Sequence, residues 1–408
     1  MIEIRRATTD ELPSWLATMA FVFHETFDPA KNAEAVRELY DFDRVWGAWE
    51  GSRPVGTLRG SGTWLTVPGG AQVPATGLSG VTVMPTHRRG GILTRMIGAE
   101  HAAARERGEV ASALYASEAP IYGRFGYGAA VQSGEWTIDT LAARVRGEPS
   151  GTVEWADPAV ARDDVLRIYD AHRARQVGEL HRKSFRFDYA LGLREWPDEP
   201  PWRGRLLLHR DATGSPDGYA RYVAKEEWRH GMPRYTVEVQ DLHTANDAAW
   251  VDLWRYLVGM DFVSTIKADH RAVHEPLPWI LENGRHAVLS GAGDGLYVCL
   301  LDLTAALAAR SYDHEDALVL EVAGGPWGQD ARERVRLDAG PAGAMVTATE
   351  ASPDLTLRAS ALAAAYLGGG PLGSVVLGGG ADEHTAGALA RASRLFATID
   401  QPWCSTFF

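Results

Sequence analysis

The spacing of apolar residues in the first part of the chain alternates between a period of two and a period of about 3.6 residues. Residues 2–6 alternate charged and aliphatic side chains and predict a first strand. Residues 12–23 carry apolar side chains at helical spacing after the helix-start residue Thr9. Two short apolar runs at residues 45–49 and 55–65 flank a Gly-Ser pair and predict an antiparallel hairpin.

A strand at residues 78–83 leads into a loop rich in Arg and Gly. A helix follows from Ile92, with one apolar side, and stops at Gly108. Residues 110–115 predict another strand, and their weak alternation indicates that both faces of this strand are covered. The N-terminal block therefore predicts an α/β domain over residues 1–147.

A Gly- and Pro-containing stretch at residues 147–152 predicts a linker to a second α/β block over residues 148–296. The elements expected in it are a helix at 163–175, a hairpin turn at 214–218, a strand at 235–240 and a helix at 245–260. This order repeats that of the first block, but its strand-to-helix junction at residues 241–247 is acidic and lacks glycine. We interpret the block as a degenerate repeat that has lost its ligand site, the alternative being unrelated α/β packing.

From Tyr297 the composition becomes rich in Ala, Leu and Gly. The pattern predicts strands at 317–322, 335–338 and 345–349, then helices around Leu362 and Leu389. This order is typical of an α+β domain over residues 297–408. A chain of 408 residues is long enough for the three domains.

Composition narrows the classes of function. The chain is 45% hydrophobic and 23% charged, as globular proteins are, and its net charge of -12 disfavours nucleic acid and favours cationic partners. Cys299 and Cys404 are too few for a disulfide framework or a zinc cage, so we expect no metal and a reducing, cytoplasmic setting. No secretion signal or membrane span is expected.

The loop before Ile92 has the chemistry of an anion site. Arg88 and Arg89 precede Gly90 and Gly91, so two cations and a flexible backbone stand at the positive end of a helix dipole. This arrangement is suited to a pyrophosphate. The alternative is a solvated basic loop.

The C-terminal residues form a second unusual segment. Residues 403–408 contain three aromatic side chains, so we expect this segment to be buried and the third domain to be indispensable. A buried carboxylate at Phe408 needs donors or a cationic partner, and the ammonium group of a substrate would serve. The alternative is that the aromatic residues only cap the core of the third domain.

The basic loop resembles the coenzyme A loop of GNAT acetyltransferases, R/Q-x-x-G-x-G/A, with Arg88 and Gly91 matching and Leu93 in place of the final small residue. Together with the segment Ser117-Glu118-Ala119-Pro120-Ile121-Tyr122-Gly123-Arg124-Phe125-Gly126-Tyr127-Gly128, it resembles the Eis family of acetyl-CoA-dependent N-acetyltransferases. The resemblance extends over the whole chain. It implies tandem GNAT folds, the second degenerate, followed by a domain similar to sterol carrier proteins, to which residues 354–368 are similar.

The resemblance also implies roles for single residues in binding acetyl-CoA. Val81 and Val83 would contact the acetyl and pantetheine portions where their strand splays from its neighbour. Arg88, Arg89 and Gly91 would hold the pyrophosphate. No metal is implied.

For catalysis, the resemblance implies that Tyr127 is the general acid and that the Phe408 carboxylate is the general base. A phenol with a reference pKa of about 10 keeps its proton at neutral pH and can donate it to a thiolate. The alternative for Tyr127 is a core aromatic residue, as we expect Tyr122 and Phe125 to be.

On the amine side, Glu25 resembles an acidic position of the family's substrate pocket, the alternative being a surface carboxylate. Val36 falls where some members have a tryptophan, and His24 is expected to be structural. The substrates implied are aminoglycosides, with polyamines and lysine side chains as further candidates, and the assembly implied is a homohexamer.

Two other functions are compatible with the sequence. In the first, the third domain is the working part of a lipid or sterol carrier with a vestigial N-terminal block, against which the intact basic loop argues. In the second, the chain acetylates peptide N-termini or a thiol sugar, because tandem GNAT domains also occur there.

Overall fold

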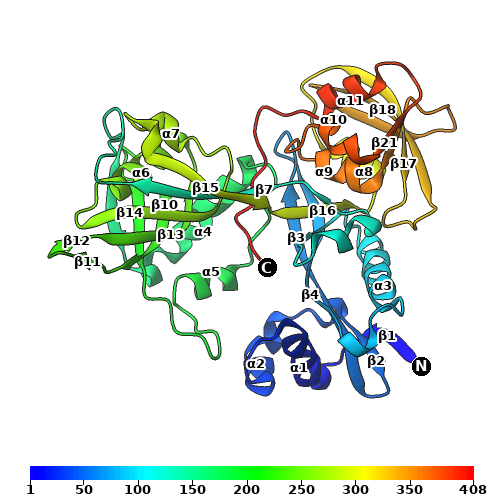
Figure 1. Ribbon diagram of the computed structural model, residues 1–408, viewed down its shortest axis with the longest axis horizontal. Coiled ribbons are helices and arrows are strands. Elements are labelled where there is room, and N and C mark those ends of the chain that lie inside the picture. Colours follow the sequence, from blue (N-terminus) through cyan, green and yellow to red (C-terminus); the bar gives the residue numbers. More distant parts are fainter.

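The computed structural model describes residues 1–408, and its strands form three large sheets in separate parts of the molecule (Figure 1). A two-stranded ribbon of β11 (Trp228–Arg229) and β12 (Met232–Pro233) extends from the second sheet's side of the molecule. No helix is long and apolar enough to cross a membrane.

The first sheet has the strand order β1-β2-β3-β4-β5-β16-β6. Its strands are β1 (Ile2–Arg6), β2 (Val45–Glu50), β3 (Arg53–Thr66), β4 (Gln72–Val83), β5 (Ala111–Tyr115), β16 (Leu296–Leu300) and β6 (Gly128–Ala129). Helices α1 (Leu12–Phe23) and α2 (Pro29–Val36) lie on one side of it, and α3 (Ile92–Glu106) lies on the other (Figure 1).

The second sheet has the order β15-β7-β14-β13-β10-β9-β8. Its strands are β15 (Ala287–Asp294), β7 (Gln132–Asp139), β14 (Val263–Arg271), β13 (Tyr235–Thr244), β10 (Pro216–Lys225), β9 (Arg205–Arg210) and β8 (Thr152–Ala156). Its helices are α4 (Pro158–Arg175), α5 (Ser184–Ala190), α6 (Asp247–Val258) and α7 (Leu277–Ile280). Helix α4 begins earlier than expected because Asp157 caps it, accepting hydrogen bonds from the backbone N–H groups of Ala159 and Val160.

The third sheet has the order β19-β18-β17-β20-β21. Its elements are β17 (Asp316–Ala323), β18 (Arg332–Gly340), β19 (Gly343–Ala348), β20 (Leu355–Arg358), β21 (Ala381–Glu383), α8 (Leu303–Ala309), α9 (Ala359–Ala365), α10 (Leu372–Val375) and α11 (Ala388–Phe396). The expected helices and strands of this block are confirmed, and the structure adds the helices α8 and α10 and the strands β20 and β21.

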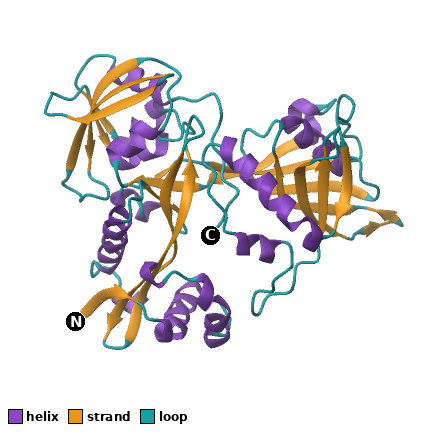
Figure 2. Ribbon diagram, turned by 180° about the vertical axis from the view of Figure 1, so that it is seen from behind, coloured by secondary structure: helices purple, strands orange, loops and turns teal.

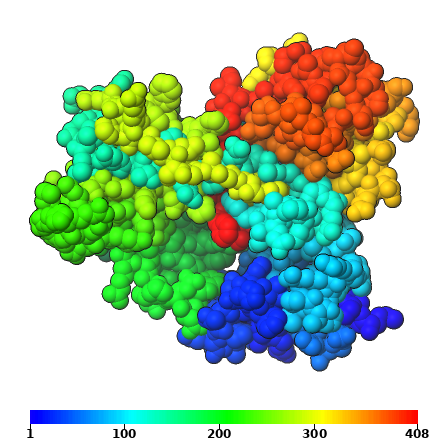
Figure 3. All heavy atoms as spheres, viewed as in Figure 1, coloured from blue at the N-terminus to red at the C-terminus, as the bar shows by residue number.

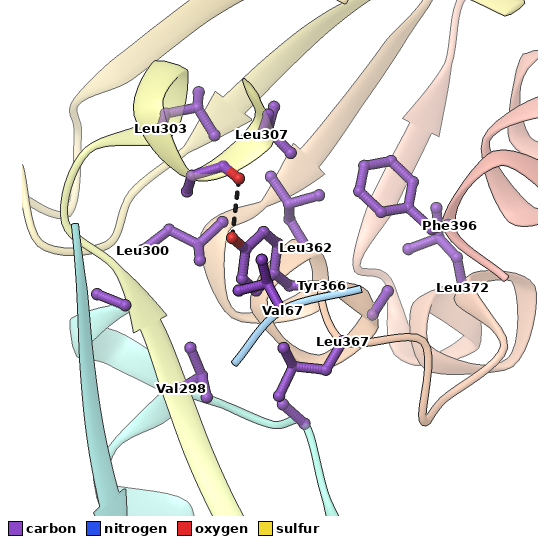
Figure 4. Packing of buried hydrophobic residues seen from close by; sticks show 14 of the residues in the cluster. Val67, Val298, Leu300, Leu303, Leu307, Leu362, Tyr366, Leu367, Leu372 and Phe396 are labelled. Atoms are coloured by element: carbon purple, nitrogen blue, oxygen red, sulfur yellow. Dashed lines mark hydrogen bonds between the residues drawn. The ribbon is translucent and has the colours of Figure 1, made fainter. Parts of the chain in front are cut away.

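The core of the third domain is filled with side chains (Figure 4). Leu362, Tyr366 and Phe396 are at most 2% exposed, and the Tyr366 hydroxyl donates to the carbonyl of Ala306 at 2.8 Å. Val298 of β16 belongs to the same cluster of 38 buried residues. The first and third domains therefore share one continuous core.

Two strands cross the domain boundaries expected at residues 147 and 296. Strand β7, from the block 1–147, lies in the second sheet between β15 and β14, and β16, at the start of the third block, lies in the first sheet between β5 and β6. All five residues of β16 are buried. The boundaries follow chain order but not the sheets, because each exchanged strand pairs backbone groups that its own block would leave open.

The first two sheets share a local geometry that supports the interpretation of a repeat. The parallel pair β4 and β5 is in register from Ala75 to Leu78, and the rest of β4 diverges from β5. In the second sheet, β13 pairs in parallel with β14 from Tyr235 to Val239 and then diverges in the same way. Each repeat thus opens a gap between its two central parallel strands.

Candidate active site

A cavity of about 970 Å³ lies where α1, α2 and β4 of the first domain face α5 of the second domain. Aromatic side chains line it from three parts of the chain, including Phe27, Tyr115 and Tyr189. The last two residues of the chain reach this cavity, and Figure 3 shows the C-terminal end emerging in the hollow between the first and second domains.

The divergent part of β4 leads from this cavity to the basic loop. Residues 79–83 have β3 on one edge and no strand on the other, so backbone N–H and C=O groups on the open edge are available to a ligand. Val81 lines the cavity, and Val83 is further along the same open edge.

The basic loop presents uncapped backbone donors and free cations. Gly91 is the N-cap of α3, with a left-handed φ of 73°, and no side chain caps the helix and no acidic residue occupies its first turn. Arg88 and Arg89 are exposed and form no ion pair, and the only hydrogen bond of either side chain is a long one, 3.4 Å, from Arg88 Nε to the carbonyl of Val83. These features fit the pyrophosphate site that the sequence predicts.

The C-terminal tail is held by a buried carboxylate of the second domain. Glu179 is fully buried, and its Oε2 accepts from the backbone N–H and the hydroxyl of Ser405 at 2.8 and 2.7 Å. Its Oε1 accepts from the backbone N–H of Thr406 at 3.2 Å. Burial alone would raise the pKa of Glu179, but His243, Arg182 and the Ser405 hydrogen bonds hold this pKa below its ordinary value. Glu179 therefore accepts from the tail as a carboxylate.

Further contacts fix the path of the tail across the divergent strand β13. Trp403 is 4% exposed, stacks on His243 and donates from its indole N–H to the carbonyl of His270. The hydroxyls of Thr406 and Tyr169 are 2.6 Å apart. The tail thus lies over the gap in the second sheet, and its end stops beside α5 (Figure 2).

The burial expected for the tail is confirmed for Trp403 and in part for Phe408, whereas Phe407 is 63% exposed. The Phe408 ring lies against β4, where a Cβ on Gly77 would come within 2.6 Å of it. The ring also packs edge-on against Tyr115 at 5.7 Å between centroids. A glycine at position 77 therefore makes room for the last residue of the chain at the start of the open edge.

The two tyrosines of the segment 117–128 have different surroundings. Tyr127 is 1% exposed and does not line the cavity; its hydroxyl is 2.6 Å from Ser112 Oγ and 2.9 Å from His101 Nε2. Tyr122 is buried in the same hydrophobic cluster as Tyr127, as expected of a core residue, and it also lines the cavity. Burial raises the pKa of Tyr122 above its ordinary value, with Glu118 adding to the shift, so this phenol keeps its proton at neutral pH.

The expected amine-binding residue Glu25 also lines the cavity. Partial burial raises the pKa of Glu25, and no charged neighbour contributes to that shift. Val36, which stands where some family members have a tryptophan, also lines the cavity. A valine therefore borders the pocket at this position. His24 ends α1 in a left-handed conformation and does not line the cavity.

The structure thus brings Glu25, Val81 and Phe408 to one cavity and places Arg88, Arg89 and Gly91 at the far end of the open strand. It does not bring Tyr127 there. The sequence reasoning missed Tyr122 as a cavity residue and Glu179 as the anchor of the tail. Tyr122 lies in the motif already singled out, whereas a lone Glu gives no signal of its role before the fold is known.

Comparisons with known proteins agree with this arrangement. A model of the GNAT acetyltransferase domain matches residues 3–130, and a second such model matches residues 178–293. A model of the sterol carrier protein domain matches residues 303–405. These matches confirm the expected order of two GNAT domains and a sterol-carrier-protein-like domain.

Curated relatives span nearly the whole chain. An N-acetyltransferase of Streptomyces griseus, described as uncharacterized, is 36% identical over 100% of both chains. The N-acetyltransferase Eis of Mycobacterium tuberculosis is 32% identical over 95% of this chain and 91% of its own. Among solved structures, Eis1 from Mycobacterium abscessus aligns over 100% of both chains with a TM-score of 0.86 and 28% identity.

Proposed function

Since the chain belongs to the Eis family of GNAT N-acetyltransferases, we propose that it transfers the acetyl group of acetyl-CoA to primary amines of cationic small molecules such as aminoglycosides. The observation that carries this proposal is the open edge of β4. It joins a cavity with a carboxylate, Glu25, to an uncapped helix start with two free arginines. Polyamines and lysine side chains are further candidate substrates.

In this proposal, the first domain binds acetyl-CoA along the open edge. The α3 N-terminus, Arg88 and Arg89 take the pyrophosphate, because charge-assisted hydrogen bonds and the helix dipole both favour an anion there. Val81 and Val83 supply backbone groups to the pantetheine and acetyl portions. The acetyl group then lies at the cavity, from which the open edge of β4 leads to the basic loop.

The amine is held and deprotonated in the cavity. Glu25 and the surrounding aromatic rings suit an ammonium group, through charge and cation–π attraction. The carboxylate that follows Phe408 accepts the proton, so that the neutral nitrogen attacks the thioester carbonyl carbon and the carbon–sulfur bond breaks. The anchoring of Ser405 and Thr406 by Glu179 supports this role, because it holds the end of the tail at the cavity.

The leaving thiolate requires a proton donor. The resemblance assigns this role to Tyr127, but the geometry favours Tyr122, which lines the cavity together with Phe408. The Tyr127 hydroxyl is already engaged by Ser112 and His101 in the core. We therefore propose Tyr122 as the general acid and Tyr127 as a residue that packs behind it, with ring centroids 5.9 Å apart.

The lipid-carrier alternative has less support, since large side chains such as Tyr366 and Phe396 fill the core of the third domain. The homohexameric assembly that the family resemblance implies and the cytoplasmic location expected from the cysteine content remain predictions.

The function is tested by following CoA release from acetyl-CoA with the purified chain and a panel of aminoglycosides, polyamines and lysine peptides. We expect amine-dependent CoA release with several aminoglycosides, and mass spectrometry should show a gain of one acetyl group for each modified amine. Absence of amine-dependent release across the panel would reject the proposal.

We predict that the double variant Arg88→Ala/Arg89→Ala raises the KM for acetyl-CoA at least about tenfold and changes the KM for the amine much less. The reason is that each charge-assisted contact to a phosphate contributes about 1.5–3 kcal/mol. Steady-state kinetics with each substrate varied in turn provide the measurement. Arg53→Ala, at an exposed arginine of β3 without an ion pair, is the matched control. An unchanged KM for acetyl-CoA in a folded double variant would remove the loop from cofactor binding.

We predict that Tyr122→Phe lowers kcat by roughly 10²–10⁴-fold, since it deletes only the proton donor. Tyr127→Phe removes hydrogen bonds to Ser112 and His101, so it should lower the thermal midpoint and leave most of kcat intact. Measuring kcat and thermal unfolding for both variants separates the two assignments. The reverse pattern, with kcat lost only in Tyr127→Phe, would restore Tyr127 as the general acid.

We predict that a few residues appended after Phe408 lower kcat by about 10²-fold or more, because they displace the carboxylate while every native side chain stays. Glu179→Gln should release the tail, with faster hydrogen exchange over residues 403–408 and a lower kcat. Glu154→Gln, at a surface ion pair with Arg210, is the control for that variant. Normal turnover by a stably folded extended chain would make Glu25 the next candidate base.

A further inference from the structure

The side chain of Phe408 occupies a socket where the central parallel strands of the first sheet begin to diverge. Gly77 is the last but one residue of β4 that pairs with β5, and Tyr115 follows the last paired residue, Leu114. One face of this paired segment forms the floor of the socket and carries only small residues: Ala75, Gly77, Ala111 and Ala113. Phe408 and Tyr115 pack against the cluster of buried residues that contains these alanines. The socket therefore lies at the start of the open edge of β4.

The backbone of Gly77 gives no reason for a glycine at this position. Its φ lies outside the left-handed region, and a glycine inside a strand weakens that strand. At this residue β4 pairs with β3 on one edge and with β5 on the other, so its backbone is held in place. A Cβ on Gly77 would stand 2.6 Å from Cε2 and 3.0 Å from Cζ of Phe408, inside the carbon–carbon contact distance of about 3.5 Å. The Phe408 ring therefore takes the space that any other side chain would fill.

Tyr115 forms a wall of the socket and also holds the backbone that leads into it. The centroid of its ring lies 5.7 Å from that of Phe408 and 4.8 Å from that of Phe407. Its hydroxyl donates to the carbonyl of Thr406 at 3.1 Å, and burial raises the pKa of Tyr115, so the phenol keeps the proton that it donates. Arg186 donates to the next carbonyl, that of Phe407, at 3.0 Å. The two carbonyl groups that precede Phe408 are thus both held.

The contact with Glu179 does not reach this far along the tail. Its hydrogen bonds end at Ser405 and Thr406, and each residue beyond them adds two rotatable backbone angles. Phe407 and Phe408 therefore lie between this anchor and the carboxylate that follows Phe408. A proton acceptor has to lie within about 3 Å of the group that it deprotonates, and an anchor two residues away does not ensure that distance. The socket supplies the missing constraint, because it holds Phe408 itself.

Resting on the proposed acetyl transfer, we propose that Gly77 and Tyr115 are positioning residues for the carboxylate that follows Phe408. Gly77 admits the Phe408 ring to the floor of the socket, and Tyr115 holds both the ring and the Thr406 carbonyl from the side. The Phe408 side chain thereby acts as the anchor that directs this carboxylate into the cavity. If the ring only filled space, a change in its position would alter stability and leave turnover as it is.

Gly77→Ala pushes the ring out of the socket, so we expect kcat to fall about tenfold or more. Both KM values should change little, since the groups that bind the two substrates stay in place. Gly293→Ala is the matched control, because this glycine lies in strand β15 and nothing lies within 4 Å of an added Cβ. Steady-state kinetics and thermal unfolding of both variants provide the measurement. Normal kcat in a folded Gly77→Ala variant would overturn the inference.

A smaller side chain at position 408 should restore the fit. Leucine lacks the ring atoms Cε2 and Cζ that meet the added methyl group, so Gly77→Ala/Phe408→Leu should turn over within about threefold of the wild-type rate. The methyl group fills space that leucine leaves, so the double variant should be at least as fast as Phe408→Leu alone, even if Gly77→Ala alone does not fold. Phe21→Leu, at an exposed phenylalanine outside the cavity lining, is the control for the lost ring. A double variant slower than Phe408→Leu, or no faster than a folded Gly77→Ala, would reject the socket.

Tyr115→Phe keeps the ring and removes the hydrogen bond to Thr406, so kcat should fall about threefold to tenfold. Tyr297→Phe is the matched control, since it also loses one hydroxyl, which donates to Asp294 at 2.6 Å outside the cavity lining. We expect the control to keep its kcat. Equal kcat in the two variants would exclude Tyr115 from the positioning of the tail.

A measurement without turnover keeps this inference separate from the proposed function. Carboxypeptidase A releases phenylalanine from the full chain only when the tail leaves the cavity. We expect release from Gly77→Ala to be at least about fivefold faster than from the wild-type chain, and release from Gly293→Ala to be unchanged. If no amine is acetylated but this difference is found, the proposed function fails and the socket stands. Equal release from Gly77→Ala and the wild-type chain would reject the socket.

Discussion

The buried carboxylate of Glu179 is the interaction on which the arrangement of the cavity depends. It collects donors from the backbone and hydroxyl of Ser405, from the backbone of Thr406 and from the Tyr169 hydroxyl. A buried anion is costly unless it is fully hydrogen-bonded, so the tail and Glu179 stabilise each other and either would be unfavourable alone. This contact joins residues 405 and 406 to the second domain and fixes their position beside the cavity.

Strands β7 and β16 link the three domains, because β7 lies in the second sheet and β16 lies in the first. Because β16 completes the first sheet and enters the shared core with the third domain, the start of the third domain is bonded to the sheet that carries the cavity. The tail that returns from the third domain then crosses the second domain to reach the first. The third domain thus contributes to the cavity through the tail that leaves it, while its side chains pack in the core that it shares with the first domain.

The two divergent strand pairs show how one geometry serves two purposes. In the first repeat, the gap beside β4 leads to an uncapped helix with arginines before it. In the second, Asn246 caps α6 with its own side chain and Asp247 occupies the first turn, so an anion has no place there. The gap beside β13 is covered by the tail through Trp403 and Ser405. The gap beside β13 is in this way suited to anchor the C-terminal residues.

From the sequence alone, periodicity and cap residues determined most elements, and the loop from Arg88 to Gly91 with the segment 117–128 determined the family. These are local signals, since the residues involved are adjacent in the chain. Only the tertiary structure decided that β7 and β16 change sheets, because strand pairing depends on which open edges meet in space. It also decided that Tyr122 faces the cavity while Tyr127 packs in the core, although the two lie five residues apart in one motif. The cavity is likewise a product of folding: Arg59 of β3 lies in the first domain and Arg186 of α5 in the second, and they line the same cavity only because the two domains face each other.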